Sequence, residues 1–237
     1  MTAAAKKTRR PRGARNKPAD PRLAILAAAL PHVPFDGFTD RVIEKAAKEA
    51  GVPRDVLARL FPNGPLSLVE VFSEHADAEM ERKLAKLKLA NLKIRERITA
   101  AIQFRLDALK AHKEAARRAA AFLTLPPNAA TGVKLLYRTV DAIWRAIGDT
   151  STDFNFYTKR AILAGVYSTT LLRWFADTSE GERATEKFLA HRIEDVMQFE
   201  KFKAKLREQA SGWPSFSELL NPAARAAPGR RPKAKGA

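Results

Sequence analysis

Apolar residues recur with a helical period from Arg22 to Leu220, and no stretch alternates convincingly between apolar and polar side chains. This pattern predicts an all-α fold. Proline and glycine divide the pattern into these expected helices: 21–33, 39–50, 53–61, 65–90, 92–110, 112–124, 131–147, 152–176 and 182–208. A chain of 237 residues is long enough to bury a sizeable core. We therefore expect a helical bundle with a true interior.

The net charge of +17 is concentrated at the two ends of the chain. The first 22 residues carry eight Lys or Arg and one Asp, and the last 17 carry five Lys or Arg and no acid. Both ends contain few large apolar residues, so we expect disordered basic tails. Such tails suit solubilisation or contact with an anionic membrane. An arm that tracks along DNA is the alternative.

No pattern in the sequence points to catalysis. The absence of cysteine excludes disulfides and thiolate metal sites. None of the four histidines lies three or four residues from another, and neither a Glu-x-x-His pair nor a glycine-rich phosphate loop occurs. No apolar run reaches the roughly 20 residues that a membrane span needs. We expect a protein that is not an enzyme and that holds no metal or cofactor.

The first three expected helices follow a helix-turn-helix pattern. Thr39 suits an N-cap, Gly51 suits a C′ position, and Pro53 suits the first turn of the next helix. The stretch "RLAILAAALPHVPFDGFTDRVIEKAAKEAGVPRDVLARLFPNGPLSLVEVF" resembles the N-terminal domain of the tetracycline-repressor family. However, 21–65 carries six basic and five acidic side chains, a weak footprint for DNA. Ala58 also stands where the resemblance implies a backbone-contacting Tyr, so we interpret the motif as a scaffold.

The helices after 66 combine large aromatic and small side chains, a composition that fits either a filled core or a ligand cavity. Within 131–147, one stripe of apolar residues is expected to face inward: Val133, Leu136, Tyr137, Val140, Trp144 and Ile147. The next helix is apolar around most of its circumference. If a cavity is present, we expect these residues to line it: Phe104, Leu109, Phe122, Leu136, Tyr137, Val140, Trp144, Leu163, Tyr167 and Leu171.

The start of that apolar helix carries an unusual set of side chains. If the helix begins near Thr152, then Asp153, Phe156, Tyr157 and Arg160 share one face. Aromatic residues and Arg are enriched at binding hot spots, so this face is a candidate docking surface. The alternative is that the two aromatic rings only cover the end of the bundle.

Three segments resemble a known family: "FLTLPPN" (Phe122–Asn128), "VDAIWRAIGDTSTDFNFYTKRAILAGVYSTT" (Val140–Thr170) and "DTSEGERATEKFLAHRIEDVM" (Asp177–Met197). They closely resemble the accessory lipid-binding family of ubiquinone biosynthesis, the ninth of the Coq series. The resemblance implies a repressor-like fold without repressor function. It implies an apolar cavity for polyprenylated quinone precursors or phospholipid, and delivery to a di-iron demethoxyubiquinone hydroxylase.

The resemblance also assigns residues. It places the family's partner-binding face on Asp153, Phe156, Tyr157 and Arg160, with Phe156 standing where Trp is common. It favours Trp144, Leu163 and Tyr167 as cavity lining. At the C-terminal end, a short amphipathic segment replaces the family's long amphipathic helix, and its expected membrane-contact residues are Trp213, Phe216, Leu219 and Leu220.

The sequence thus predicts a basic tail over 1–20, a helix-turn-helix-like domain over 21–65, a lipid-binding and dimerisation domain over 66–208, and an amphipathic segment with a basic tail over 209–237. The expected protein is a homodimeric, non-catalytic lipid carrier, peripheral on the inner membrane of a bacterium. The proline-rich basic start makes a mitochondrial matrix location the less favoured alternative. The competing hypothesis for function is a ligand-responsive transcriptional regulator of the tetracycline-repressor family.

Overall fold

The computed structural model describes residues 20–149 and 154–210. Every regular element in these ranges is a helix, which confirms the all-α prediction. The α-helices are α1 (Pro21–Ala29), α2 (Val33–Asp36), α3 (Asp40–Glu49), α4 (Arg54–Leu60), α5 (Pro65–Leu84), α6 (Ile94–Lys110), α7 (Lys113–Thr124), α8 (Ala129–Ala146), α9 (Phe154–Phe175) and α10 (Arg183–Ala210). Three short 3₁₀ turns separate them: η1 (Leu89–Asn91), η2 (Pro126–Asn128) and η3 (Glu180–Glu182).

The boundaries mostly follow the local signals in the sequence. Thr39 caps α3 by accepting a hydrogen bond from the Val42 amide, and Gly51 takes a positive φ of 67° just after it. Gly148 does the same after α8, at φ 90°. Two predictions were wrong. The expected helix 21–33 ends at Ala29 and is followed by the separate short α2, and the expected helix 65–90 ends at Leu84.

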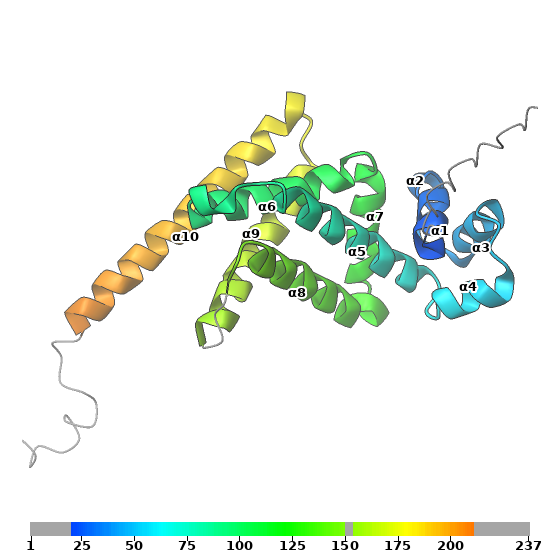
Figure 1. The fold of residues 1–237 in the computed structure, drawn as a ribbon, viewed down its shortest axis with the longest axis horizontal. Coiled ribbons are helices and arrows are strands. Elements are labelled where there is room, and N and C mark those ends of the chain that lie inside the picture. The colour runs from blue at the N-terminus through cyan, green and yellow to red at the C-terminus, as the bar shows by residue number, and fades with distance from the viewer. Residues whose placement is uncertain (1–19, 150–153, 211–237) are drawn as a thin grey trace, which may run out of the picture. The chain divides into compact units, whose positions relative to one another are not determined.

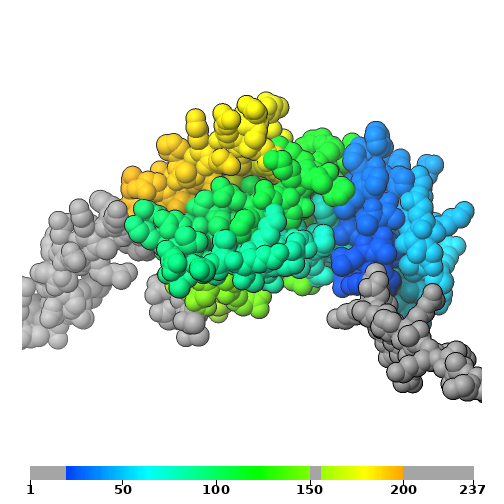
Figure 2. All heavy atoms as spheres, turned by 45° about the horizontal axis from the view of Figure 1, so that its top comes forward, coloured from blue at the N-terminus to red at the C-terminus, as the bar shows by residue number. Residues whose placement is uncertain are grey.

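The described residues up to Leu189 form one compact unit, and those from Ala190 to Ala210 belong to a second. Within the first unit, α1 packs on α3 and α5, and α2 packs on α7. Helix α5 also packs on α6 and α8, and α8 packs on α7 and α9. Figure 1 shows α1–α4 gathered at the N-terminal end of α5, and in Figure 2 their blue-to-cyan surface adjoins the green surface of the following helices.

The first unit has two parts, α1–α4 and α5–α9, and buried side chains lie in both. Ile25 of α1, Leu68 of α5 and Ile102 of α6 are fully buried, as are Ile143 of α8 and Trp174 of α9. Burying an aliphatic side chain of this size stabilises the fold by about 1.5–3 kcal/mol. The long helix α5 supplies side chains to both parts, so the two parts share one hydrophobic core.

The inward stripe predicted for α8 was partly wrong. Val140, Trp144 and Ile147 are buried, whereas Val133 is 70% exposed and Tyr137 is 46% exposed. The buried face instead includes Leu135, Thr139 and Ile143. Apolar residues lie on more than one side of this helix, and only the positions of α5, α7 and α9 decide which side is covered.

The turn between α9 and α10 is fixed by one carboxylate. Asp177 accepts hydrogen bonds from the amide and hydroxyl of Ser179 and from the amide and hydroxyl of Thr185. These bonds, led by those from Ser179 and Thr185 side chains, hold the pKa of Asp177 well below its usual range. The carboxylate therefore links the end of α9 to the first turn of α10.

Candidate functional site

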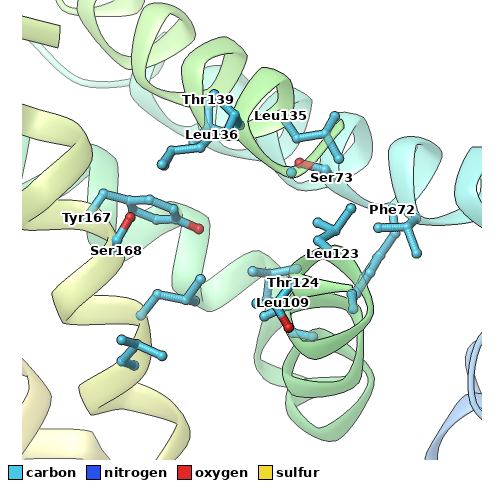
Figure 3. A pocket seen from close by; sticks show the side chains of 18 of the residues that line it. Phe72, Ser73, Leu109, Leu123, Thr124, Leu135, Leu136, Thr139, Tyr167 and Ser168 are labelled. Atoms are coloured by element: carbon cyan, nitrogen blue, oxygen red, sulfur yellow. The ribbon is translucent and has the colours of Figure 1, made fainter. Parts of the chain in front are cut away.

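A pocket of about 460 Å³ lies among α5, α6, α7, α8 and α9. Figure 3 shows Tyr167 and Ser168 of α9 on one side of it and Phe72 and Leu123 on the opposite side. Its wall comes from α5 (Val69, Phe72, Ser73), α6 (Arg105, Leu109), α7 (Ala116, Ala119, Ala120, Leu123, Thr124), α8 (Ala129, Gly132, Val133, Leu135, Leu136, Thr139) and α9 (Tyr167, Ser168, Leu171, Leu172, Phe175).

Small residues on α7 and α8 make room for this pocket. Ala116, Ala119 and Ala120 share one side of α7, at helical spacings of three and four residues. On α8, a Cβ at Gly132 would stand 3.1 Å from the Leu123 carbonyl oxygen, so glycine permits close approach of the two helices. The space therefore results from short side chains on helices that are themselves closely packed.

One end of the pocket wall is polar and centres on Arg105, which is only 5% exposed. Its Nε donates to the Asp77 carboxylate at 2.6 Å, and its Nη2 donates to Ser73 Oγ at 3.0 Å and to Thr139 Oγ1 at 3.1 Å. Its Nη1 donates to the Tyr167 hydroxyl. We call Ser73, Asp77, Arg105, Thr139 and Tyr167 the polar wall. It joins α5, α6, α8 and α9.

The Tyr167 hydroxyl and the Arg105 guanidinium stay protonated at neutral pH. Burial raises the pKa of the Tyr167 hydroxyl above its ordinary value, although the Arg105 charge acts in the opposite direction. Burial acts to lower the pKa of Arg105, but interactions with Tyr167 and Asp77 outweigh it and raise that pKa. The pocket thus presents a protonated phenol and a guanidinium beside apolar side chains.

Four of the ten side chains predicted to line a cavity do line this pocket: Leu109, Leu136, Tyr167 and Leu171. The other six lie outside its wall: Phe104, Phe122, Tyr137, Val140, Trp144 and Leu163. The assignment of lipid binding to these residues stays a prediction.

The six outliers have other surroundings. Val140, Trp144 and Leu163 are buried in α8 and α9, and the Trp144 indole donates to the Lys159 carbonyl oxygen at 3.3 Å. The Phe122 ring packs against Phe38, with ring centroids 6.2 Å apart. Lys83 Nζ lies 5.4 Å from the centroid of the Phe104 ring. Tyr137 is exposed on α8. An apolar side chain can be buried in the core without reaching the empty space.

Sequence reasoning found Tyr167 but missed the other members of the polar wall and the contribution of α5. Nothing in the local sequence marks Arg105 as buried, because its partners lie 28 to 62 residues away. The alanines of α7 were detectable, since Ala116, Ala119 and Ala120 place three small side chains on one helix face. Such a face predicts close packing or a gap.

The candidate docking face at the start of α9 is only partly described, because Asp153 lies outside the described residues. Tyr157 is 67% exposed, and its ring meets that of Phe156 edge-on, with centroids 5.1 Å apart. Arg160 was expected on this surface, but it is buried. It is 4% exposed and is paired with Asp141 at 2.8 Å.

The Arg160 side chain instead packs against the ring of Phe156. Its guanidinium lies 3.4 Å from the centroid of the Phe156 ring, and its Nη1 donates to the Phe156 carbonyl oxygen at 3.2 Å. Asp141 belongs to α8, so this ion pair also ties the start of α9 to the preceding helix. The position of Arg160 is that of a residue that orients Phe156.

Both basic side chains of α4 are paired with acids. Arg54 contacts Glu44 at 3.2 Å, and Arg59 contacts Asp55 at 3.0 Å. These are two cations of α4, the helix that would read DNA in a repressor. Ala58 is exposed between them. Helix α4 itself therefore offers little uncompensated positive charge to phosphates.

Within 20–149 and 154–210, no group of three or more His, Cys, Asp or Glu side chains could hold a metal ion. Across the same described ranges, no helix is long and apolar enough to cross a membrane. The expected membrane-contact residues, Trp213, Phe216, Leu219 and Leu220, lie outside these ranges, as do most of both basic tails.

The model of the COQ9 family matches residues 129–200, which include α8, α9 and the start of α10. The mitochondrial ubiquinone biosynthesis protein COQ9 of Bos taurus is 37% identical over 180 residues, which cover 73% of this chain. The human protein of the same name is 35% identical over 180 residues. The chain belongs to the COQ9 family. It spans 56% of the length of each of these two relatives.

More distant comparisons agree with this assignment. A probable mitochondrial COQ9 protein of Dictyostelium discoideum is 28% identical and covers 79% of this chain and 63% of its own length. Among solved structures, a TetR transcriptional regulator from Nitrosomonas europaea superposes with a TM-score of 0.61 at 23% identity, over 76% of this chain and 99% of that one. That likeness confirms the repressor-like fold.

Proposed function

We propose that this COQ9-family protein is a non-catalytic lipid-binding protein of ubiquinone biosynthesis. It would hold a polyprenylated quinone intermediate and present it to the demethoxyubiquinone hydroxylase. The observation that carries the proposal is the 460 Å³ pocket, whose wall is mostly apolar and which lies among α5–α9. Small-molecule sites are commonly apolar cavities of about 300–1,000 Å³ with a few polar groups.

The size of the pocket limits how much of a ligand it can hold. Its 460 Å³ lies toward the lower end of the range of about 300–1,000 Å³ that small-molecule cavities commonly have. A substituted quinone ring with one or two isoprene units fits such a space, whereas a long polyprenyl tail does not. The rest of the tail would therefore stay outside, and affinity should rise little beyond the first isoprene units.

For the hydroxylase we propose a docking surface centred on Tyr157 and Phe156. Tyr157 is the most exposed aromatic side chain described on α9, and the Phe156 ring packs against it. Exposed aromatic residues are frequent anchors of protein interfaces. Asp153 keeps its place in the proposal from the sequence, and Arg160 acts by holding Phe156 in position.

Location, membrane contact and oligomeric state belong to the same proposal. The matched relatives are named as mitochondrial proteins. We propose that the protein works at an inner membrane, bacterial or mitochondrial, with its C-terminal basic tail and the segment from Trp213 to Leu220 on anionic lipid. We also propose a homodimer, supported by the exposed apolar side chains of Val133 and Tyr137 on α8 and of Leu172 on α9.

Mass spectrometry of organic extracts tests the lipid proposal. Protein purified without detergent should yield a polyprenyl quinone or a precursor close to one per protomer. Ala120→Phe places a large ring in the pocket and should reduce recovery at least about tenfold. Ala121→Phe is the matched control, because its side chain is exposed and lies outside the pocket wall. Equal recovery from both variants would contradict binding in this pocket.

A binding assay with the hydroxylase tests the docking proposal. Tyr157→Ala should weaken binding by at least about thirtyfold, as expected for a central aromatic anchor. Phe35→Ala is the control, because Phe35 of α2 is 84% exposed and lies in the helix-turn-helix segment. If both variants bind like the unaltered protein, the α9 surface is not the docking site.

A further inference from the structure

The polar wall offers the pocket several hydrogen-bond donors that have no acceptor among the described residues. Arg105 uses four of its five N–H groups on partners among the described residues, which leaves one Nη1 hydrogen without an acceptor there. The hydroxyl oxygens of Tyr167 and Ser73 accept bonds from Arg105, and in the described part of the chain neither hydroxyl proton has an acceptor. Three donors thus border the apolar space.

The remaining members of the polar wall are internally satisfied. The Thr139 hydroxyl accepts from Arg105 and lies 3.1 Å from both oxygens of the Asp77 carboxylate, to which it can donate. Asp77 is the one member of the polar wall that does not itself line the pocket. A buried donor without an acceptor is unfavourable, so a ligand that supplies acceptor oxygens gains affinity here.

The net charge of the polar wall favours a neutral ligand group over a negatively charged one. The Arg105 guanidinium is paired with the Asp77 carboxylate at 2.6 Å, so the cluster carries no net charge. A carboxylate or phosphate would bring an uncompensated negative charge close to Asp77 in a buried site. A neutral carbonyl oxygen accepts hydrogen bonds without that penalty, and a quinone ring carries two of them.

We infer that the polar wall is the head-group subsite of the pocket, in which Tyr167, Ser73 and Arg105 donate hydrogen bonds to a neutral carbonyl oxygen of the ligand. The isoprenoid end then lies along the apolar side formed by Leu123, Leu136 and Leu171. This inference rests on the proposed lipid-binding function and adds the orientation of the ligand. The wall is preorganised, because Arg105 holds both hydroxyl oxygens in place.

Calorimetric titration of the full chain, freed of co-purified lipid, tests the inference with three probes. They are a ubiquinone with two isoprene units, an isoprenoid hydrocarbon of similar size without oxygen, and a medium-chain fatty acid as its carboxylate. The quinone should bind about tenfold more tightly than the hydrocarbon, which is the effect of one net hydrogen bond. The carboxylate should bind more weakly than the quinone.

Variants assign this preference to the polar wall. Tyr167→Phe keeps the ring and removes the hydroxyl, so it should lower quinone affinity about tenfold and leave hydrocarbon affinity within about twofold. Tyr137→Phe is the matched control, because that exposed hydroxyl lies outside the pocket wall, and it should change neither affinity. Ser73→Ala gives a second, independent removal of a donor if Tyr167→Phe folds poorly.

The outcomes distinguish failure of the head-group subsite from failure of the proposed lipid-binding function. Equal binding of quinone and hydrocarbon, unchanged by Tyr167→Phe and Ser73→Ala, would overturn the head-group subsite and leave lipid binding intact. A carboxylate that binds most tightly would overturn the assignment to a neutral carbonyl. If none of the three probes binds, both the subsite and the proposed lipid-binding function are wrong.

Discussion

The helix-turn-helix segment α1–α4 and the pocket region α5–α9 differ in how the interior is packed and in whether their ion pairs are buried. In α1–α4 apolar side chains such as Ile25 and Val42 are buried, and the described ion pairs of α4 are exposed. In α5–α9 a 460 Å³ space is left open, and the Arg105–Asp77 pair is buried beside it. The first region thus fits a scaffold, and the second fits a binding site.

The contrast in charge predicts the largest effect. Arg105→Leu leaves the Asp77 carboxylate buried without its cation and should lower the free energy of unfolding by about 3–5 kcal/mol. Adding Asp77→Leu should restore most of that loss, because both charges are then removed. Arg59→Leu, in the exposed pair with Asp55, should change stability by less than about 1 kcal/mol. Urea denaturation measures all three, and equal losses at Arg105 and Arg59 would contradict the contrast.

The contrast in packing predicts a smaller but direct difference. Ile25→Ala opens a new cavity in a filled core and should cost about 2–5 kcal/mol of stability. Leu171→Ala only enlarges a space that already exists, so it should cost about 1 kcal/mol. Thermal or urea denaturation distinguishes them. A Leu171→Ala loss as large as that of Ile25→Ala would mean that the pocket is filled in solution.

The contrast in function predicts the smallest effect, on binding to DNA. Glu44→Gln with Asp55→Asn frees Arg54 and Arg59 from their acidic partners. Non-specific DNA binding should then become stronger, and its salt dependence should steepen by about one to two units of logarithmic slope. Electrophoretic mobility shifts at several salt concentrations measure this. A tight, salt-resistant complex of the unaltered protein with one DNA sequence would instead favour the transcriptional regulator.

The local sequence was a good guide wherever the physical cause is local. Thr39, Gly51 and Gly148 end or begin helices through their own side chains or backbone freedom, so their roles were predictable. The helix predicted over 65–90 was too long. The chain leaves the helix at Ala85, and no glycine or proline marks that end in the sequence. The four pocket residues found in advance, Leu109, Leu136, Tyr167 and Leu171, were selected by apolar character and helical position.

The sequence by itself determined the helical period, the near-neutral first domain and the face that pairs Phe156 with Tyr157, because these depend on neighbours within a few residues. The tertiary structure alone decided that Arg105 is buried, that Arg160 is buried and paired with Asp141 of α8, and that Trp144 is core and not part of this pocket wall. Each of these facts depends on side chains from other helices. Burial, charge pairing and empty space are properties of how helices meet, which a local pattern does not contain.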